Sequence, residues 1–242
     1  MSQTAELRFF DSVESTNDEA RRLIGTVAHP VWCIGAEQTK GVGRRGRNWA
    51  SPRGNLYASL LYPTDETAED KSLRSFLAAL ALQSALALHK TEARITLKWP
   101  NDVLVNGAKI AGILLESAPG HLIIGMGVNI MSAPPMSKVE PRAVRPAALS
   151  DLGFSLTPKQ LITDLSAAFD DWDLKFRQFG FDPIRQAWLT HAARLGETIT
   201  ARLATEEVTG VFDTVDRSGA LVLKTPTGIR QITAADIFFE GA

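Results

Sequence analysis

Cysteine is nearly absent from this 242-residue chain: Cys33 is the single one, so no disulfide can form within it. It lies in the apolar run of residues 31–34, which predicts a small buried side chain and not a reactive thiol. The four histidines are scattered, without the spacing of a metal site. No apolar run approaches the roughly 18 residues of a bilayer-spanning helix, and the N-terminus does not read as a signal peptide. These absences predict a soluble cytoplasmic protein without a membrane partner.

A surplus of positive charge is missing as well. The chain has 26 lysines and arginines against 27 aspartates and glutamates, for a net charge of −1. Proteins that bind nucleic acid usually carry a basic surplus, so DNA is not an expected partner and local basic clusters need another explanation. With 45% hydrophobic residues, the chain can form one large domain with a small appendage.

Segments with helical and strand periodicity alternate along the chain, which favours a fold of mixed helices and strands. Residues 72–90 place large apolar side chains, Leu88 among them, at helical spacing. Thr157 followed by Pro158 is the cap and first-turn proline of another helix. The dipeptide at residues 106–107, Asn-Gly, predicts a type I′ hairpin.

The end of the chain differs in character from the rest. A helix that opens at Asp182 and Pro183 is expected to end near Gly196. Short β segments with glycine turns follow, at residues 198–203, 208–215, 220–223 and 229–232. This tail is too short for a sandwich and fits a small barrel. We therefore predict two domains, residues 1–195 and 196–242.

A glycine-punctuated basic loop covers residues 41–47, with the sequence Gly-Val-Gly-Arg-Arg-Gly-Arg. Glycines free the backbone so that successive N–H groups can face one anion. Arginines add positive charge and can form bidentate hydrogen bonds with a carboxylate or phosphate. Alone, the pattern fits a solvated basic loop or a nucleic-acid contact as well as it fits an anionic small molecule.

Three further segments combine polar groups with strand ends or glycine-containing strands. The Lys-Trp-Pro-Asn-Asp motif of residues 98–102 follows a strand, where ligand sites concentrate. Lys109 stands in an otherwise apolar strand, so its charge must meet an anion or reach solvent. Gly127 and Asn129 share strand parity and should face the same side. Singly, these segments also fit an ordinary turn, a strand-edge lysine and a bulge.

Neither a Ser/His/Asp or Cys/His constellation nor a Walker-type phosphate loop is apparent. What remains is a set of cationic groups on glycine-rich backbone. This suits a reaction whose difficulty is negative charge, such as attack of a carboxylate on the α-phosphate of ATP. The carboxylate is already ionised at pH 7. The reaction then needs neutralisation of repelling anions, in-line positioning and Mg²⁺ on the phosphates.

Taken together and in this order, the four segments resemble the biotin protein ligase family, best over residues 12–130. The resemblance implies an α+β fold in which helices flank a mixed sheet. That core is related to class II tRNA synthetases and to biotin and lipoate ligases, and an SH3-like β-barrel follows it. It also implies a monofunctional member, because the 14 residues before Ser15 cannot form the DNA-binding domain found on some relatives.

The resemblance further implies roles at the matching positions. The residues implied to contact biotin are Ser15, Thr16, Asn17, Gln38, Gly41, Val42, Gly43, Arg44, Lys109 and Gly112. Those implied to contact ATP are Arg45, Arg47, Trp49, Asn101, Asp102 and Asn129. Arg44 and Lys109 are the implied catalytic pair, and Asp102 is either a metal ligand or a base for the acceptor lysine. The family usually has arginine where this chain has Val42, so a guanidinium contact is lost there.

The implied activity is that of an ATP-dependent biotin–protein ligase. Biotin would be activated as biotinyl-5′-AMP with release of pyrophosphate, then transferred to a lysine of a biotin carboxyl carrier protein or domain. ATP, biotin and Mg²⁺ are the implied small molecules, and the oligomeric state stays open between monomer and homodimer. Two alternatives remain. One is a lipoate-type acyl ligase, which is expected to lack residues 41–47 and 98–102 in this form. The other is a nucleic-acid-binding module with strongly salt-dependent affinity.

Overall fold

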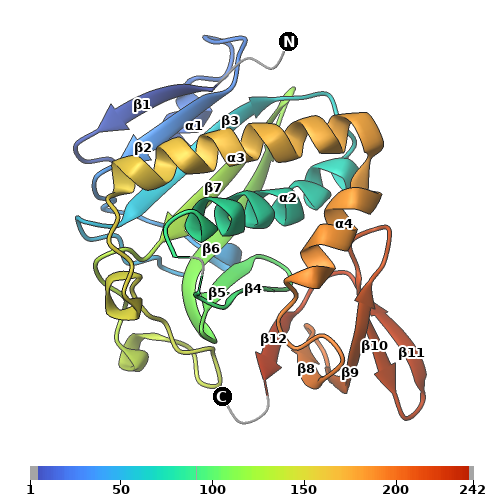
Figure 1. The fold of residues 1–242 in the computed structure, drawn as a ribbon. Coiled ribbons are helices and arrows are strands. Elements are labelled where there is room, and N and C mark those ends of the chain that lie inside the picture. The colour runs from blue at the N-terminus through green and yellow to red at the C-terminus, as the bar shows by residue number, and fades with distance from the viewer. Residues whose placement is uncertain (1–4, 91, 240–242) are drawn as a thin grey trace.

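The computed structural model describes residues 5–90 and 92–239, which form two sheets and a set of flanking helices (Figure 1). The first sheet has the strand order β1-β2-β3-β7-β6-β5-β4, and the second has the order β11-β10-β9-β8-β12. The strands of the first sheet are β1 (Glu6–Phe10), β2 (Val31–Gly35), β3 (Leu56–Pro63), β4 (Ile95–Lys98), β5 (Asp102–Val105), β6 (Ala108–Ala118) and β7 (His121–Val128). The helices are α1 (Thr16–Arg22), α2 (Ala68–Ala87), α3 (Pro158–Phe179) and α4 (Phe181–Thr190).

The first sheet is mixed, because β1 pairs parallel with β2 and each of its other ladders is antiparallel. Alternate residues of its central strands face opposite layers. Leu60 and Ile124 belong to the core beneath α2 and α3, whereas Leu61 and Ile123 pack with Cys33 under α1. The prediction of a mixed sheet flanked by helices is confirmed, and Cys33 is fully buried as expected.

Local signals set the limits of the long helices. Thr157 and Gln160 form a reciprocal capping box, and Pro158 occupies the first turn of α3, as predicted. The prediction for α2 was wrong at its end. The helix stops at Ala87, and Leu88 is 72% exposed instead of packed in the core. At residues 106–107 both backbone φ angles are positive, 50° and 80°, which confirms the hairpin between β5 and β6.

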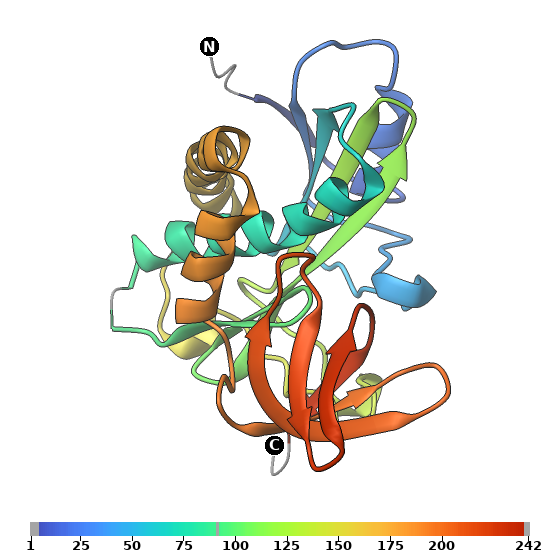
Figure 2. The ribbon, with the colours of Figure 1, turned by 90° about the vertical axis from the view of Figure 1, so that its right-hand side faces the viewer.

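The second sheet is antiparallel throughout and fits an SH3-like fold, and Figure 2 shows it as a layer of orange and red strands below the main sheet. Its strands are β8 (Thr198–Arg202), β9 (Glu207–Val215), β10 (Leu221–Thr225), β11 (Gly228–Ile232) and β12 (Asp236–Phe239). Two predictions fail here. The helix α4 ends at Thr190, well before Gly196, and β12 is an additional strand that pairs with β8.

Specific contacts fix the second sheet against the rest of the described chain. The indole nitrogen of Trp99 donates to the carbonyl of Gly219 at 3.0 Å. Phe239, at the end of β12, packs against Leu104, Val144 and Ala193. These contacts bring β12 next to the ends of β5 and β6, and so to the residues that the sequence marks as a site. No helix of the described residues is long and apolar enough to cross a membrane.

Candidate active site

A cavity of about 540 Å³ opens over one face of β6 and β7. Its walls come from the start of α1, the loop of residues 42–50, the turn of residues 98–102, the irregular segment of residues 134–146 and strand β12. Five stretches that are distant in sequence therefore converge on one space. The glycines of β6 and β7 leave room over its floor for the side chains of Trp49 and Asn17.

Trp49 lies against this glycine floor. Gly112 of β6 pairs directly with Gly127 of β7. A Cβ atom on Gly127 would fall 2.4 Å from the indole nitrogen of Trp49, and one on Gly112 would fall 3.2 Å from its six-membered ring. Side chains at either position would therefore displace the indole. Among residues 5–90 and 92–239, the buried Trp49 indole N–H has no hydrogen-bond partner.

One end of the cavity is rich in amide and hydroxyl groups. The Gln38 side-chain oxygen accepts from the backbone N–H of Thr16 at 2.9 Å and from its hydroxyl at 3.0 Å. Ser59 lies 2.5 Å from the side-chain oxygen of Asn17, which in turn lies against Gly125. The side-chain N–H₂ group of Asn17 is buried and has no partner in the part of the chain that the structure describes. A buried donor without a partner is costly, and a ligand acceptor would satisfy it.

The opposite end is charged, and Asp102 is its centre. Lys109 Nζ lies 2.6 Å from Asp102 Oδ1, and Lys98 Nζ lies 3.8 Å from Asp102 Oδ2. Burial alone would raise the pKa of Asp102, but the charges of Lys109 and Lys98 more than offset it and hold that pKa below its usual range. Burial also lowers the pKa of Lys98. Lys109 thus stands in an apolar strand, and its anionic partner, Asp102, comes from the neighbouring strand β5.

Arg44 reaches the charged end from the glycine-arginine loop. Its Nη1 donates to the side-chain oxygen of Asn101 at 3.2 Å, and the Asn101 amide donates onward to the carbonyl of Ile113 at 2.7 Å. Burial lowers the pKa of Arg44, although an arginine stays protonated at neutral pH. This guanidinium is therefore held beside the two lysines without a carboxylate of its own, which leaves it available to an anion.

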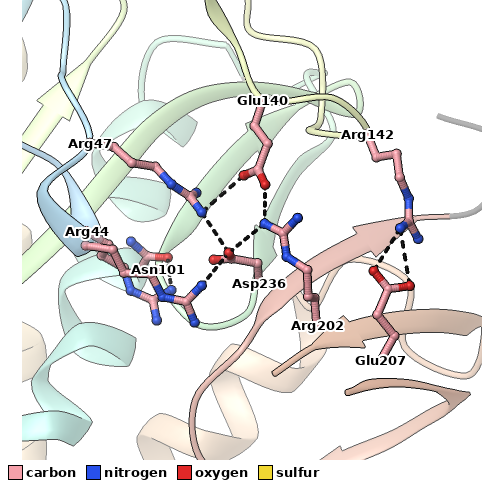
Figure 3. A network of polar contacts seen from close by, with 9 residues as sticks. Arg44, Arg47, Asn101, Glu140, Arg142, Arg202, Glu207 and Asp236 are labelled. Atoms are coloured by element: carbon pink, nitrogen blue, oxygen red, sulfur yellow. Dashed lines mark hydrogen bonds and ion pairs between the residues drawn. The ribbon is translucent and has the colours of Figure 1, made fainter. Parts of the chain in front are cut away.

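The rim beyond Arg44 carries a cluster of ion pairs between the loop and the C-terminal sheet (Figure 3). Arg45 Nη1 and Arg47 Nη2 lie 2.6 Å and 2.7 Å from Asp236 Oδ2, and Arg202 Nη2 lies 3.1 Å from the same atom. Glu140 pairs with Arg47 at 3.1 Å and also contacts Arg202. Burial would raise the pKa of Asp236, but the hydrogen bonds from Arg47 and Arg202 hold it low. Asp236 is therefore ionised at neutral pH.

In the described part of the chain, no group of three or more histidine, cysteine, aspartate or glutamate side chains could hold a metal ion. The Asp102 oxygens face Lys109 and Lys98. The predicted role of Asp102 as a metal ligand therefore stays a prediction.

Comparisons with known proteins bear directly on this site. The profile described as the biotin/lipoate A/B protein ligase family matches residues 9–129, and the biotin protein ligase C terminal domain matches residues 195–240. The biotin--[acetyl-CoA-carboxylase] ligase of Paracoccus denitrificans is 44% identical over 94% of this chain and 98% of its own length. The chain belongs to the biotin protein ligase family.

Two further relatives of this family member refine the comparison. The structure of the biotin protein ligase from Aquifex aeolicus in complex with biotin and ATP superposes with a TM-score of 0.83 at 27% identity, and it covers 96% of this chain and 97% of the other. The bifunctional ligase/repressor of Bacillus subtilis is 29% identical over 96% of this chain but only 73% of its own length. The resemblance in fold therefore extends over both sheets.

The structure brings most of the predicted site residues of this biotin protein ligase family member together. The predicted residues that line the cavity are Ser15, Thr16, Asn17, Gln38, Val42, Gly43, Arg44, Arg47, Trp49, Asn101, Asp102, Lys109, Gly112 and Asn129. Gly41 and Arg45 lie outside the lining. Gly41 is buried where a Cβ would meet the Ser51 hydroxyl and the Trp49 carbonyl at 2.5 Å, so its role is to let the loop close. Arg45 points to Asp236.

Sequence reasoning missed the far wall of the site. Glu140, Ala143 and Asp236 line the cavity, and none of them belongs to a segment that the sequence marked. Asp236 opens the unpredicted strand β12, and Glu140 lies in a proline-rich stretch that showed no periodicity. Pairing of charge across a long sequence separation leaves no local signal.

Proposed function

We propose that this chain is an ATP-dependent biotin–protein ligase that forms biotinyl-5′-AMP and transfers the biotinyl group to a lysine of a biotin carboxyl carrier protein or domain. One observation carries the proposal. A single cavity joins an end rich in amide and hydroxyl groups to an end where Arg44 and Lys109 supply positive charge. At the first end, the Asn17 amide donor has no partner among the described residues. Biotin has the matching polarity, with a ureido ring at one end and a carboxylate at the other.

The proposed pose follows from this polarity. The ureido ring would lie by Thr16, Asn17 and Gln38, where its carbonyl can accept from the orphaned Asn17 amide. The valeryl chain would pass beside the Trp49 indole, which itself lies on the glycine floor, and the carboxylate would reach Lys109. The Aquifex aeolicus relative, solved with biotin and ATP, supports a site that holds both substrates at once.

We propose two chemical steps at the charged end. A biotin carboxylate oxygen attacks the α-phosphorus of ATP, and the bond to pyrophosphate breaks. Arg44 and Lys109 offset the repulsion between carboxylate and phosphate, and Lys109 leaves Asp102 to do so. The acceptor lysine amine then attacks the acyl carbon, AMP departs, and Asp102 accepts the amine proton. Mg²⁺ would travel with the ATP phosphates.

The division of the chain into two domains is also a proposal. Residues 1–195 would form the catalytic domain and residues 196–242 the SH3-like domain, a division that the two separate sheets and the C-terminal family match support. The name of the Paracoccus denitrificans relative supports an acetyl-CoA carboxylase subunit as the acceptor. The loop arginines face a cavity and carboxylates, which does not favour their use as a nucleic-acid clamp.

The proposed function predicts which acid supports exchange of pyrophosphate with ATP. Biotin should support exchange, whereas lipoate and octanoate should not, because the amide-lined end offers polar groups that their hydrocarbon and disulfide ends cannot satisfy. The measurement is incorporation of labelled pyrophosphate into ATP with each acid in turn. Exchange with lipoate but not with biotin would overturn the assignment.

Replacing Arg44 with glycine should make the protein release its adenylate early. Biotinyl-AMP is a reactive mixed anhydride, and Arg44 is the loop guanidinium that lacks a carboxylate partner and faces the reacting groups. We expect Arg44→Gly to form adenylate but to release it on the order of ten times faster than the wild type does, a loss of about 1.4 kcal/mol. The measurements are the dissociation rate of preformed biotinyl-AMP and the labelling of an unrelated lysine-rich protein.

Two comparison variants sharpen this test. Arg47→Ala should release biotinyl-AMP more slowly than Arg44→Gly does, because Arg47 already pairs with Asp236 and Glu140. Arg53→Gly should not leak, since Arg53 pairs with Asp11 at 2.7 Å and does not line the cavity. If Arg44→Gly releases the adenylate at the wild-type rate, Arg44 does not retain the intermediate.

A further inference from the structure

An ion cluster at the cavity rim joins the loop of residues 41–48 to the C-terminal sheet (Figure 3). We call it the rim cluster. Its members are Arg45, Arg47, Glu140, Arg202 and Asp236. Three guanidinium groups converge on one oxygen, Asp236 Oδ2, and the cluster holds three positive charges against two negative ones. Asp236 is the member that touches all three arginines, so it holds the cluster together.

The loop depends on side chains for its position. Its own backbone hydrogen bonds close within it, from Gly43 N to the Arg47 carbonyl at 2.7 Å and from Trp49 N to the Gly41 carbonyl at 2.9 Å. Arg45 takes a left-handed backbone conformation, with φ of 57°, which a non-glycine residue rarely adopts without outside support. Asp236 supplies that support from β12, 191 positions further along the chain than Arg45. This strand is itself fixed by its ladder to β8.

We infer that Asp236 is a positioning residue, which holds the arginine loop over the phosphate end of the cavity through Arg45 and Arg47. The C-terminal sheet would then be a working part of the active site and not only an appendage. As far as it concerns ATP, this inference rests on the proposed function. Its effect on the loop in the free protein does not.

The charges give the direction of the effect. Without the Asp236 carboxylate, Arg45 would lose its carboxylate in the rim cluster, and only Glu140 would remain to pair with Arg47 and Arg202. The mutual repulsion of the three guanidinium groups would then be offset less well. Arg202 is held in a ladder and Glu140 also pairs with it, whereas the loop has no ladder of that kind. The loop is therefore the part that would move away. It would take Arg44 and Arg47 from the phosphate end with it.

The two substrates should respond differently to this movement. The phosphate end takes Arg44 and Arg47 from the loop. The amide-rich end is built by Thr16 and Asn17, whose contacts with Gln38 and Ser59 do not involve the rim cluster. Loss of Asp236 should thus weaken ATP binding while it spares biotin.

The experiment uses the full chain with Asp236→Asn, Asp236→Glu and a matched control, Glu207→Gln. The control removes a carboxylate that also pairs an arginine of residues 134–146 with the C-terminal sheet, Arg142 at 2.9 Å, but away from the cavity (Figure 3). For Asp236→Asn we expect faster amide exchange in residues 41–48 of the ligand-free protein. The KM for ATP should rise about fivefold to tenfold, with the KM for biotin within about twofold of wild type. Asp236→Glu keeps a carboxylate, so its loop amide exchange and its KM for ATP should return most of the way to the wild-type values. Glu207→Gln should behave as wild type.

A second variant covers the case in which Asp236→Asn disturbs the sheet, visible as faster exchange in β8 to β10. Arg45→Met removes one link from the loop side, at a side chain that is 45% exposed, and cannot unfold the sheet. Arg45→Met should also speed amide exchange in residues 41–48. Its effect should be smaller when it is added to Asp236→Asn, because the link from Arg45 is then already broken. The inference is overturned if amide exchange in residues 41–48 stays at the wild-type rate in Arg45→Met or in a folded Asp236→Asn variant. An unchanged KM for ATP in Asp236→Asn also overturns it. Failure of biotin to support exchange of pyrophosphate with ATP would instead overturn the proposed function. The two failures can be told apart, because amide exchange in the loop is measured without substrates.

Discussion

Replacing Lys109 with alanine is expected to slow biotin adenylation by a factor of about 30 to 1,000, equivalent to about 2–4 kcal/mol of transition-state stabilisation. Lys109 stands on β6 with its ammonium group 2.6 Å from Asp102 and over the ring of Trp49. Its side chain is about one-quarter exposed, so solvent screens the charge only in part. In the proposed first step, this charge moves from Asp102 to the carboxylate and α-phosphate, where negative charge accumulates.

The substitution has a second consequence at Asp102. Lys109 is the nearer of its two cationic partners, and Lys98 at 3.8 Å would remain as the other. Because burial opposes ionisation of Asp102, losing Lys109 should raise the pKa of this carboxyl group toward its usual range. Substrate binding should suffer less than the rate, since the proposed role of Lys109 concerns the reacting groups and not the ureido ring.

The measurement is single-turnover formation of biotinyl-AMP with saturating biotin and ATP. Lys40→Ala is the matched control, because Lys40 lies at the base of the arginine loop, pairs with Glu14 at 2.7 Å and does not line the cavity. It should adenylate biotin at the wild-type rate. Near-normal adenylation by Lys109→Ala would show that the charge of Lys109 does not act on the reacting groups.

The parts of this site that sequence could predict are those whose signal is local. A glycine-rich arginine loop, a polar turn after a strand and a lysine in an apolar strand each break an expected pattern within a few residues, and the structure places these segments around one cavity. Asn106 and Thr157 were predictable for the same reason, because hairpin and capping chemistry acts over two to four residues.

What sequence could not predict depends on long-range contacts. The edge strand β1 has only partly buried and exposed residues, without clear alternation, so pairing with β2 and not propensity defines it. The short strand β12 exists through its ladder with β8. Asp236 matters because the fold brings it to Arg45 and Arg47, and nothing in its neighbours indicates this. Leu88 shows the converse, since it continued a helical pattern one residue beyond the helix.

Replacing Arg74 with methionine is expected to destabilise the protein by about 3–5 kcal/mol, although this residue lies far from the cavity. Arg74 on α2 is fully buried, and its guanidinium group contacts the carboxylates of Glu66 and Asp173. It also stacks over the rings of Tyr62, at 4.5 Å, and Phe176, at 4.7 Å. The network joins β3, α2 and α3 at the core face of the main sheet.

The cost arises from the partner that is left behind. Asp173 is only 6% exposed, and without Arg74 it would keep the Tyr62 hydroxyl at 3.0 Å and the outer guanidinium group of Arg177 at 3.0 Å. Removing one member of a buried ion pair leaves a poorly compensated charge, whereas removing both can be nearly neutral. The double variant Arg74→Met with Asp173→Leu should therefore recover a large part of the stability that Arg74→Met loses.

Arg177→Met provides the matched comparison, because Arg177 pairs with the same carboxylate from a side chain that is 45% exposed. Solvent screens such a pair, so its loss should cost less than about 1 kcal/mol. The measurement is the free energy of unfolding from denaturant titration of the wild type and the three variants. Equal losses for Arg74→Met and Arg177→Met would mean that burial does not govern the strength of this network. A double variant less stable than Arg74→Met alone would mean that packing, and not the stranded charge, sets the cost, since methionine and leucine would then fail to fill the space between α2 and α3.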